Sequence, residues 1–527
     1  MKFEIRNSFE WTYPDTAPEQ SAGEVSLTVL KSSRASFCIF CEDFNASAGL
    51  CFTAQTPEHV QACLYRLLPV RVSENTGVHG FTLKGDEDDA DIFDAHGKPY
   101  YTRIAPFYVY DAMTPANTCN SFNTRECFFA EFVTSAQTQA GEYTVKISLF
   151  GQSITVYLTV ADLCSPEQTL YITNWHSNAI IAKRYGLEPW SDAHFEMIEQ
   201  YVRLMRLARQ NVAWITYDCV KTDSEGNFDF SNAERLADIY LRNGIKLIEG
   251  APFFGRDEWQ SKIFKISTPQ GQREAMSDEG YAYACKFISA WMGFIKDAGL
   301  KDKLIQHVGD EPHNDCKDEY IALCSLVRML MPGVPLIEAV ETYDLKGGPD
   351  IFVPKNDYYE RNTAELEKLR ECGHTLWFYT CCIPGGFYMN RLLDMPLLKT
   401  RYLHWGNYKY NIPGYLHWGF NHLNPEYDTL EYSELEFEPN KPNRLPAGDT
   451  HIVYSDGVKP LRSLRLEQMR AGAEEYELFK LLGSKDADKA SELLARCFTS
   501  FCECNTDADN FNSVRRLLID AVKGSIG

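Results

Sequence analysis

Hydrophobic and polar positions alternate in two different ways along this chain. Up to about residue 165, short runs place apolar and polar side chains on alternate positions, as in strands that have one buried and one exposed face. The clearest runs are residues 25–42, 103–111, 128–134, 143–149 and 154–160. We therefore expect an all-β domain over residues 1–165, built as a β-sandwich of two packed antiparallel sheets.

After residue 165, short apolar runs are separated by longer stretches with helical periodicity. Eight of these runs are typical of buried strands: residues 170–175, 212–217, 246–251, 304–309, 335–340, 350–354, 375–381 and 414–419. Strands that alternate with helices favour a parallel sheet, and eight such units predict a (β/α)8 barrel of the TIM type. We assign this α/β barrel domain to residues 166–440.

The last part of the chain, residues 441–527, has a different pattern. It predicts a short strand at 450–454 and three helices at about 461–482, 485–504 and 509–522. We expect these helices to pack on the barrel as a C-terminal helical tail. The predicted fold class is therefore multidomain, with a β-sandwich, a (β/α)8 barrel and a helical tail.

Composition narrows the classes of partner. The chain has 527 residues, with Asp+Glu 73 against Lys+Arg 52, and a formal net charge of −21. That charge repels phosphate backbones, so nucleic acid is not an expected partner. No apolar run approaches the roughly 20 residues that span a bilayer, and the first residues lack the apolar core of a secretory signal. We expect no membrane partner and a cytoplasmic location, and the oligomeric state is left open.

Seventeen cysteines are scattered along the chain. The count is odd and many lie in apolar runs, which favours free thiols in a reducing compartment. Cys38, Cys41, Cys51 and Cys63 suggest zinc ligands as an alternative, but their spacing fits no compact zinc knuckle and the first pair lies in a strand pattern. We predict no metal and no cofactor.

The main candidate for chemistry is the adjacent pair Asp310 and Glu311, which follows the fourth predicted barrel strand. Active sites of such barrels lie at the carboxyl ends of the strands, where this pair falls. Two acids this close cannot both ionise freely, so one is suited to donate a proton. The alternative is a helix-capping Asp beside a surface Glu in a non-catalytic loop.

An acidic pair at this position suggests glycoside hydrolysis, which needs a protonated carboxyl group and a second group that stabilises the oxocarbenium-like centre. The predicted seventh strand, residues 375–381, contains no carboxylate that can act as a nucleophile. An N-acetyl group on the substrate can take that role, with Asp310 orienting the amide and Glu311 as the acid and then the base. The alternative is an enzyme nucleophile, for which Glu338 or Glu341 must reach the substrate.

Aromatic and amide groups at the strand ends suit a carbohydrate, because aromatic faces stack on the apolar faces of sugars. The candidate substrate-binding residues are Asn174, Trp175, Tyr217, Trp377, Tyr379 and Trp418. About half of them are expected to touch substrate, since a buried tryptophan is more often part of a core. Glu249, Glu338 and Glu341 are either supporting acids or solvated loop residues.

From about residue 170 to residue 482 the chain resembles the catalytic domain of glycoside hydrolase family 123. The motifs that carry the resemblance are Thr173-Asn174-Trp175, Gly309-Asp310-Glu311-Pro312, Trp377-Phe378-Tyr379, Asn390-Arg391 and Gly414-Tyr415-Leu416-His417-Trp418.

The resemblance implies a β-N-acetylgalactosaminidase with a β-sandwich before a barrel. It implies that Asp310 polarises the acetamido group, that Glu311 is the acid and base, and that Tyr379 hydrogen-bonds the acetamido group. It also places Arg391 among the substrate-binding residues. The implied partner is a small glycan or glycoconjugate with a terminal N-acetylhexosamine. A catalytically inactive glycan-binding protein is the alternative from another class.

Overall fold

The computed structural model describes residues 1–44, 50, 52–83, 99–116, 123–436 and 444–526. The chain forms two compact units. Unit 1 contains Met1–Thr169, Gly385–Tyr410 and Asn421–Gly527, and unit 2 contains Leu170–Pro384 and Asn411–Phe420. The candidate pair Asp310 and Glu311 therefore lies in unit 2.

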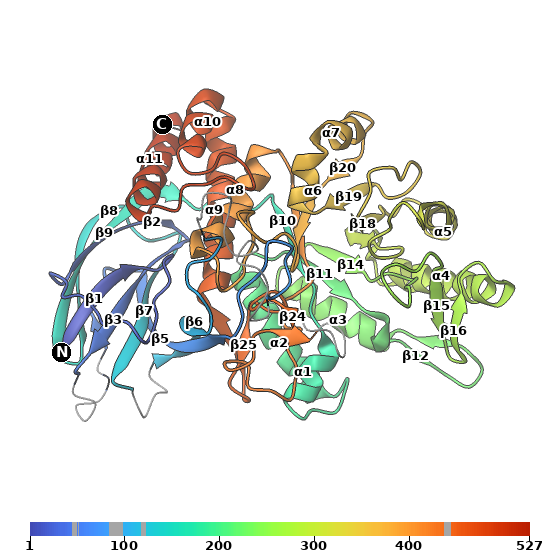
Figure 1. Ribbon diagram of the computed structural model, residues 1–527, viewed down its shortest axis with the longest axis horizontal. Helices are drawn as coiled ribbons and strands as arrows, with labels where there is room; N and C mark the ends of the chain where they lie inside the picture. Colours follow the sequence, from blue (N-terminus) through green and yellow to red (C-terminus); the bar gives the residue numbers. More distant parts are fainter. Residues whose placement is uncertain (45–49, 51, 84–98, 117–122, 437–443, 527) are drawn as a thin grey trace. The chain divides into compact units, whose positions relative to one another are not determined.

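Two large β-sheets dominate the first part of unit 1 (Figure 1). The larger sheet has the order β1 (Lys2–Asn7), β3 (Arg34–Glu42), β7 (Arg125–Thr134), β5 (Val60–Val72), β6 (Phe107–Pro115), β26 (Pro460–Ser463) and β25 (Tyr454–Ser455). The smaller sheet has the order β2 (Glu24–Lys31), β9 (Gln152–Cys164), β8 (Gly141–Leu149) and β4 (Thr53–Ala54). Side chains of both sheets, such as Ile39 and Phe128 with Val145 and Val156, are buried in one hydrophobic core.

The predicted strand runs in this region are confirmed, but three details differ. The run at 103–111 becomes a strand only at Phe107, and β2 pairs in parallel with β9, so the smaller sheet is mixed and not antiparallel throughout as predicted. The run 25–42 is two strands, β2 and β3, which belong to different sheets. They separate at Ser32, whose φ of 56° lies in the left-handed region that suits a tight turn. The hairpin predicted at 143–149 and 154–160 is the antiparallel pair β8 and β9.

The C-terminal segment of unit 1 contributes strands as well as helices. Residues 461–463, predicted as the start of a helix, belong instead to β26, which pairs with β6 through Arg462 and Met113. The helices of unit 1 are α8 (Leu397–Lys409), α9 (Leu464–Gly483), α10 (Ala487–Ala495) and α11 (Ala508–Ile526). Helix α9 is buried along nearly its whole length and packs on α8. Its charged residues are paired, as when Arg465 Nε donates to Asp111 Oδ2 at 2.8 Å, which offsets the cost of their burial.

Unit 2 contains three parallel sheets of three strands each. Their orders are β10 (Tyr171–Asn174), β22 (Gly414–His417) and β21 (Phe378–Thr380); β11 (Val212–Ile215), β14 (Leu247–Gly250) and β17 (Leu304–Gln306); and β18 (Ile337–Val340), β19 (Ile351–Pro354) and β20 (Thr375–Leu376). All eight predicted strands are confirmed, and the seventh is divided into β20 and β21 at Trp377. Three separate sheets do not by themselves establish a closed barrel.

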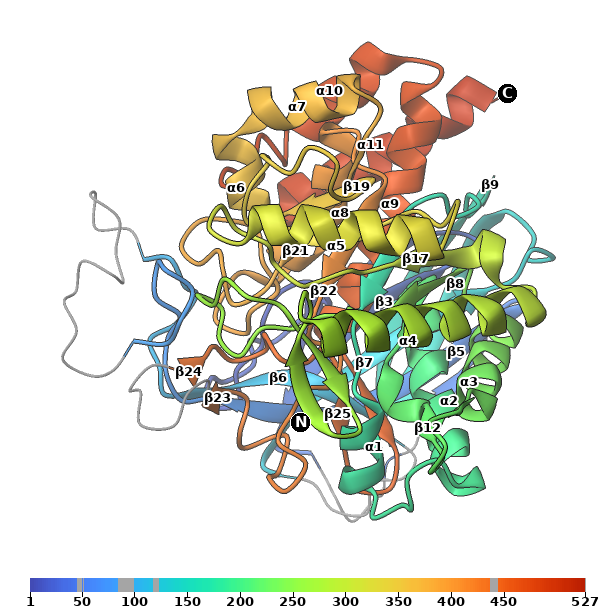
Figure 2. The same ribbon diagram turned by 90° about the vertical axis from the view of Figure 1, so that its right-hand side faces the viewer.

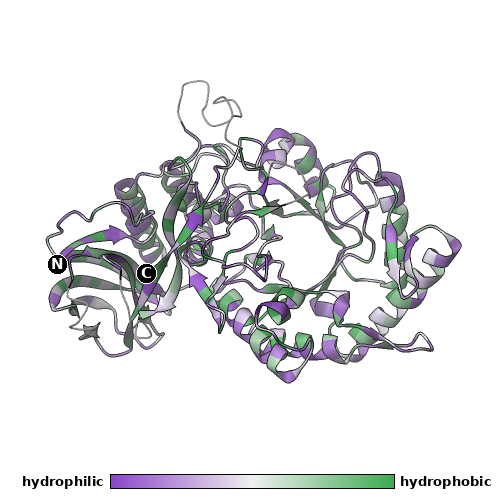
Figure 3. Ribbon diagram, turned by 60° about the horizontal axis from the view of Figure 1, so that its bottom comes forward, coloured by the Kyte–Doolittle hydropathy of each residue, from purple (hydrophilic) through white to green (hydrophobic). Residues whose placement is uncertain are grey.

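Helices connect most of these strands. They are α1 (Asn178–Arg184), α2 (Asp192–Leu207), α3 (Ser231–Arg242), α4 (Asp278–Asp297), α5 (Lys317–Leu330), α6 (Asn356–Arg361) and α7 (Thr363–Glu371). Helices α4 and α5 pack side by side (Figure 2). The helices of this unit carry both polar and apolar residues along their length, as expected of amphipathic helices with one face buried (Figure 3). Strands β18 and β19 are joined by residues 341–350 without a helix, and Gly347-Gly348-Pro349 explains why.

Within the described residues, every cysteine is a free thiol, as the sequence predicted. Cys51, one of the four possible zinc ligands, lies outside the described residues. In the described part of the chain, no group of three or more His, Cys, Asp or Glu side chains is arranged to hold a metal ion. None of the helices described there combines the length and apolar character that a membrane crossing requires.

Candidate active site

Asp310 and Glu311 lie in the loop that follows β17. The backbone of Glu311 is left-handed, with a φ of 47°, a conformation that is uncommon for a residue with a side chain. Such strain persists only where the surroundings hold it, and it is frequent at functional sites. The left-handed backbone at Glu311 therefore costs stability, and it sets the direction of the Glu311 side chain.

Two donors hold the Glu311 carboxylate. The Tyr379 hydroxyl lies 2.5 Å from its Oε1, and the Trp259 indole N–H donates to its Oε2 at 3.0 Å. Tyr379 is buried, and burial followed by the negative charges of Glu311 and Glu341 raises its pKa well above the usual value. The phenol therefore keeps its proton and acts as a donor. Each oxygen of the Glu311 carboxylate therefore has a donor that fixes its direction.

Asp310 is in the opposite situation. Among the described residues, its carboxylate accepts no hydrogen bond, and the residue is exposed. Although Asp310 is accessible to solvent, the protein atoms packed around its carboxyl group reduce its hydration, and this desolvation raises its pKa. The negative charges of Glu311 and Glu338 raise the pKa further. Asp310 therefore holds a proton more readily than an ordinary aspartic acid, and its carboxyl group is open to a substrate.

The guanidinium group of Arg256 holds the backbone of the loop that contains Asp310 and Glu311. Its Nη2 donates to the carbonyl oxygens of Asp310 and Glu311, both at 2.9 Å. Its Nη1 donates to the carbonyl oxygen of Trp259 at 2.6 Å. One side chain therefore fixes the backbone of the acidic pair and the backbone of the tryptophan that contacts it.

A buried charged network supports the same loop from the strand side. His307 lies between two carboxylates, with Nδ1 2.6 Å from Glu338 Oε1 and Nε2 2.6 Å from Glu249 Oε1, and all three side chains are fully buried. The second oxygen of Glu338 accepts from the backbone N–H groups of Val308 and Gly309, each at 2.9 Å. These two amides belong to the residues directly before Asp310, so the network fixes the backbone direction that leads into Asp310 and Glu311.

His307 is protonated in this network. Burial alone lowers the pKa of a histidine, but the charges of Glu338 and Glu249 outweigh it and raise the pKa to about 10. With both ring nitrogens protonated, each one donates to a carboxylate. Glu249 also accepts from the indole N–H of Trp175 at 2.9 Å, which links a predicted substrate-binding residue to the network.

Glu341 lies on the other side of the Tyr379 hydroxyl, which is 3.0 Å from Glu341 Oε1. The hydroxyl has one hydrogen, so it donates to only one of the two carboxylates at a time. Lys355 forms an ion pair with the same Glu341 oxygen. Glu341 is therefore close to Glu311 and neutralised by a lysine.

Two further predicted residues lie at the ends of strands in unit 2 but are held by partners. The Asn174 side chain is buried and donates to Gln210 Oε1 at 3.1 Å. Tyr217 stacks on Phe253, with ring centroids 5.2 Å apart, and accepts from Gln306 at 3.0 Å. Both side chains are anchored by these partners, which belong to other residues than Asp310 and Glu311.

The remaining three predicted residues differ in placement. Trp418 is partly exposed at the end of β22. Trp377 is buried and stacks on Tyr171, the first residue of β10, so its ring faces the start of the strands rather than the end that carries the pair. Arg391 belongs to unit 1, where it is fully buried and its carbonyl oxygen accepts from Arg465. The structure thus brings Tyr379 to the pair, and Trp175 to its supporting network.

Sequence reasoning did not identify Arg256, Trp259, His307 or Lys355. Trp259 and Arg256 lie in a loop that follows β14, and the only signal in the sequence was an aromatic residue after a predicted strand. His307 stands three residues before Asp310, but its neighbours in sequence do not reveal its carboxylate partners. Those partners come from β14 and β18.

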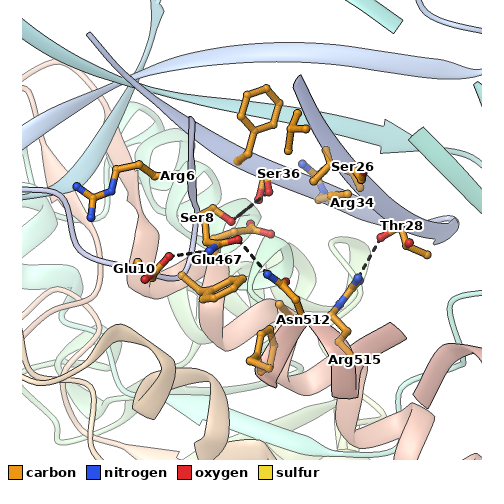
Figure 4. Close-up of a pocket in the computed structure, with 18 of the residues that line it drawn as sticks. Arg6, Ser8, Glu10, Ser26, Thr28, Arg34, Ser36, Glu467, Asn512 and Arg515 are labelled. Atoms are coloured by element: carbon orange, nitrogen blue, oxygen red, sulfur yellow. Dashed lines mark hydrogen bonds between the residues drawn. The ribbon is translucent and has the colours of Figure 1, made fainter. Parts of the chain in front are cut away.

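A separate crevice of about 650 Å³ lies within unit 1 (Figure 4). Two of the arginines that line it have partners: Arg470 donates to Glu467 at 2.5 Å, and Arg515 donates to the carbonyl oxygen of Thr28 at 3.0 Å. None of the acids of the candidate site lines it. We therefore place the chemistry at Asp310 and Glu311 and not in this crevice.

Comparison with known proteins points to one enzyme family. The model of the glycoside hydrolase 123 catalytic domain matches residues 175–482, more than half of the chain. A family 123 glycoside hydrolase from Clostridium perfringens superposes with a TM-score of 0.66 at 12% identity, covering 100% of this chain and 97% of that one. At this identity the superposition establishes a shared fold. No curated protein matches the sequence significantly.

Other solved glycosidases superpose more loosely. A putative beta-galactosidase from Bacteroides fragilis gives a TM-score of 0.34 at 11% identity, over 90% of this chain and 62% of that one. A GH10 xylanase from Thermobacillus composti gives 0.35 at 13% identity, over 58% of this chain and 97% of that one. Both scores are too low to indicate a common fold.

Proposed function

Because the chain belongs to glycoside hydrolase family 123 and is a glycoside hydrolase that acts on glycans, we propose that it is a retaining, exo-acting β-N-acetylgalactosaminidase. We propose substrate-assisted catalysis, in which the 2-acetamido group is the nucleophile. The observation that carries this proposal is that the two adjacent acids differ in their hydrogen bonding. Glu311 is held by two donors, whereas the Asp310 carboxyl group is open to a ligand.

In the proposed first step, the acetamido oxygen attacks the anomeric carbon as the bond to the leaving oxygen breaks. Glu311 gives its proton to that oxygen, Asp310 accepts the acetamido N–H, and the Tyr379 hydroxyl donates to the acetamido group. A bicyclic oxazoline-type intermediate results. In the second step, Glu311 takes a proton from water, the water oxygen attacks the anomeric carbon from the original face, and the bond from that carbon to the acetamido oxygen breaks. The acetamido group is restored and the configuration is retained.

The proton must change its place when substrate binds. In the empty site Asp310 holds a proton readily, because its pKa is raised by burial and by neighbouring negative charge. A substrate N–H at Asp310, and the positive charge that develops on the acetamido group, both favour ionised Asp310. Tyr379 meanwhile turns from Glu311 to the acetamido group. Glu311 loses a donor and takes the proton that the leaving oxygen needs.

Two substrate comparisons test this proposal. Aryl β-glycosides with a 2-acetamido group should be hydrolysed at least about a hundredfold faster than matched 2-hydroxyl glycosides, since only the first carry the nucleophile. Stepwise fluorination of the acetyl group should lower kcat further with each fluorine, because it withdraws electron density from the attacking oxygen. Comparable rates on both sugars would refute substrate assistance. The galacto- and gluco-configured acetamido substrates, compared side by side, test the preference for galactosamine.

A second candidate is a retaining glycosidase with an enzyme nucleophile. The position of Glu341 favours it, since Glu341 and Glu311 both lie within hydrogen-bonding distance of the Tyr379 hydroxyl. The ion pair with Lys355 counts against it, because an attacking carboxylate loses nucleophilicity when a cation neutralises it. Glu338, the other acid considered, is fully buried and engaged through both oxygens. Insensitivity to acetyl fluorination would favour Glu341.

We also infer that the three parallel sheets of unit 2 close into one (β/α)8 barrel. Single parallel bridges support this, because Gln306 pairs with Leu336 and Lys355 pairs with Tyr379 across the gaps between sheets. The Asn211 N–H donates to the Ile172 carbonyl at 3.2 Å across the third gap. In Figure 3 the strands of this unit stand inside its helices. The two sheets of unit 1 sharing one core support the proposed β-sandwich in the same way.

The other predictions remain proposals. They are the domain division at 1–165, 166–440 and 441–527, substrate contacts by Asn174, Trp175, Tyr217, Trp377, Arg391 and Trp418, a cytoplasmic location, a terminal N-acetylhexosamine on the substrate, and the absence of a metal or cofactor. Trp175 has the best support among these contacts, because its indole N–H is tied to the network under the pair.

A further inference from the structure

We propose that Trp259 forms the platform on which the leaving group of the substrate rests, the aglycone side of the site. This inference rests on the proposed roles of Asp310 and Glu311. Trp259 lies in residues 251–264, which connect β14 to β15 (Lys265–Thr268). Its side chain is 47% exposed, which is unusual for a tryptophan, and its indole N–H contacts the proposed acid. An exposed indole is the surface on which a sugar ring stacks.

The two carboxylate oxygens of Glu311 face different parts of the proposed site, one the terminal sugar and the other the leaving group. Oε1 faces the Tyr379 hydroxyl, which in the proposed reaction turns to the acetamido group of the terminal sugar. Oε2 faces Trp259. The oxygen that protonates the leaving group is therefore Oε2, and the indole N–H stands where the glycosidic oxygen must approach. A bound substrate takes the place of that hydrogen bond, and its leaving sugar then lies beside the indole ring.

Trp259 is held firmly enough to act as a platform. Its carbonyl oxygen accepts from Arg256 Nη1 at 2.6 Å and lies 3.1 Å from His313 Nε2. The His313 ring packs against the indole, with centroids 4.9 Å apart. Arg256 also holds the backbone of Asp310 and Glu311. The Arg256 guanidinium group thus sets the distance between Trp259 and Glu311. Because Trp259 is already held in place, it loses little conformational freedom when a sugar stacks on it.

This geometry gives the tryptophan two separable effects. The ring face contributes binding energy only when the leaving group is large enough to cover it. The N–H contributes whatever the leaving group is, because it holds the Glu311 carboxylate in position before substrate arrives. Replacement by phenylalanine removes the second effect and keeps most of the first, and replacement by alanine removes both.

The experiment compares two substrates with the same terminal sugar, a methyl β-N-acetylgalactosaminide and a disaccharide with galactose as leaving group. We expect Trp259→Ala to lower kcat/KM for the disaccharide by about tenfold more than for the methyl glycoside, relative to the wild type. Trp259→Phe should keep that difference within about threefold. It should also lower kcat/KM for both substrates by a similar factor, since the lost N–H contact with Glu311 does not depend on the leaving group. Tyr281→Ala, which removes an exposed aromatic residue from α4, is the control and should change neither readout.

An equal loss on both substrates in Trp259→Ala, with the fold retained by circular dichroism, would overturn the platform. So would a Trp259→Phe enzyme as deficient on the disaccharide as the alanine variant. Failure of the proposed function looks different, since the wild type would then show no preference for acetamido sugars. In that case the same ratio of large to small leaving group is measured with the terminal sugar that the enzyme does hydrolyse.

Discussion

Replacement of Glu338 by alanine should destabilise the enzyme more than most single substitutions, although Glu338 makes no contact with the proposed substrate. Glu338 is one of two carboxylates on a buried, protonated His307, and it is the acceptor for the backbone amides of Val308 and Gly309. The alanine variant leaves a buried charge with one partner and two backbone N–H groups without an acceptor.

The magnitude follows from those two losses. Removal of one partner from a buried ion pair costs about 3–5 kcal/mol, and an unsatisfied buried N–H group costs about 1–3 kcal/mol. The terms overlap, since water can enter the space left behind, so we expect a loss of about 4 kcal/mol or more. Glu338→Gln is the matched control, because its amide oxygen can still accept from the backbone. There His307 becomes neutral and accepts from the amide N–H, and we expect a loss of about 1–2 kcal/mol.

Two measurements check this prediction. Urea unfolding gives the midpoint for each variant, and amide hydrogen exchange in the segment 304–312 reports the local effect. Every 1.4 kcal/mol lost should raise the opening of that segment about tenfold. Alanine and glutamine variants that agree within about 1 kcal/mol would refute the reasoning, because the amide bonds and the ion pair would then contribute nothing net.

The other predictions concern the pair, its tyrosine and pH. Glu311→Gln should slow unactivated glycosides far more than activated aryl glycosides, because a good leaving group needs little protonation. Asp310→Asn should slow both kinds of substrate by a similar factor of about a hundred. A plot of log kcat against leaving-group acidity separates the two variants, and the opposite pattern would reverse the two roles. Tyr379→Phe should lower kcat on acetamido substrates by about a hundredfold, since a preorganised donor is lost, with the fold retained; unchanged steady-state rates would show that the hydroxyl is not used. The pKa of His307 is raised to about 10 in the folded protein, above the unfolded value of about 6.5. Its stabilising contribution, at most about 5 kcal/mol, is therefore complete below about pH 6.5 and lost as the pH rises to about 10. Urea midpoints across this range should fall in the wild type and fall less in His307→Gln.

Local pattern alone determined much of this protein. Each parallel strand of unit 2 was predicted from a few consecutive apolar residues, because a buried parallel strand needs no distant information to be recognised. The position of Asp310 and Glu311 at the end of the fourth strand followed from the same pattern. Tyr379 was also identified from its place on the seventh strand, and its hydrogen bond with Glu311 joins it to the pair.

Only the tertiary structure decided which charges meet. Glu249 lies on β14, His307 directly follows β17, and Glu338 lies on β18. A spacing of tens of residues in the sequence says nothing about which of these side chains meet in the interior. The same holds for Arg256 and Trp259, whose loop reaches the acidic pair because Phe254 pairs with Gly309. Strand β26 joins a sheet whose other main strands lie more than 300 residues earlier in the chain. Buried charges and sheet edges are satisfied by whichever partner the fold brings near, and that partner is set by the path of the whole chain.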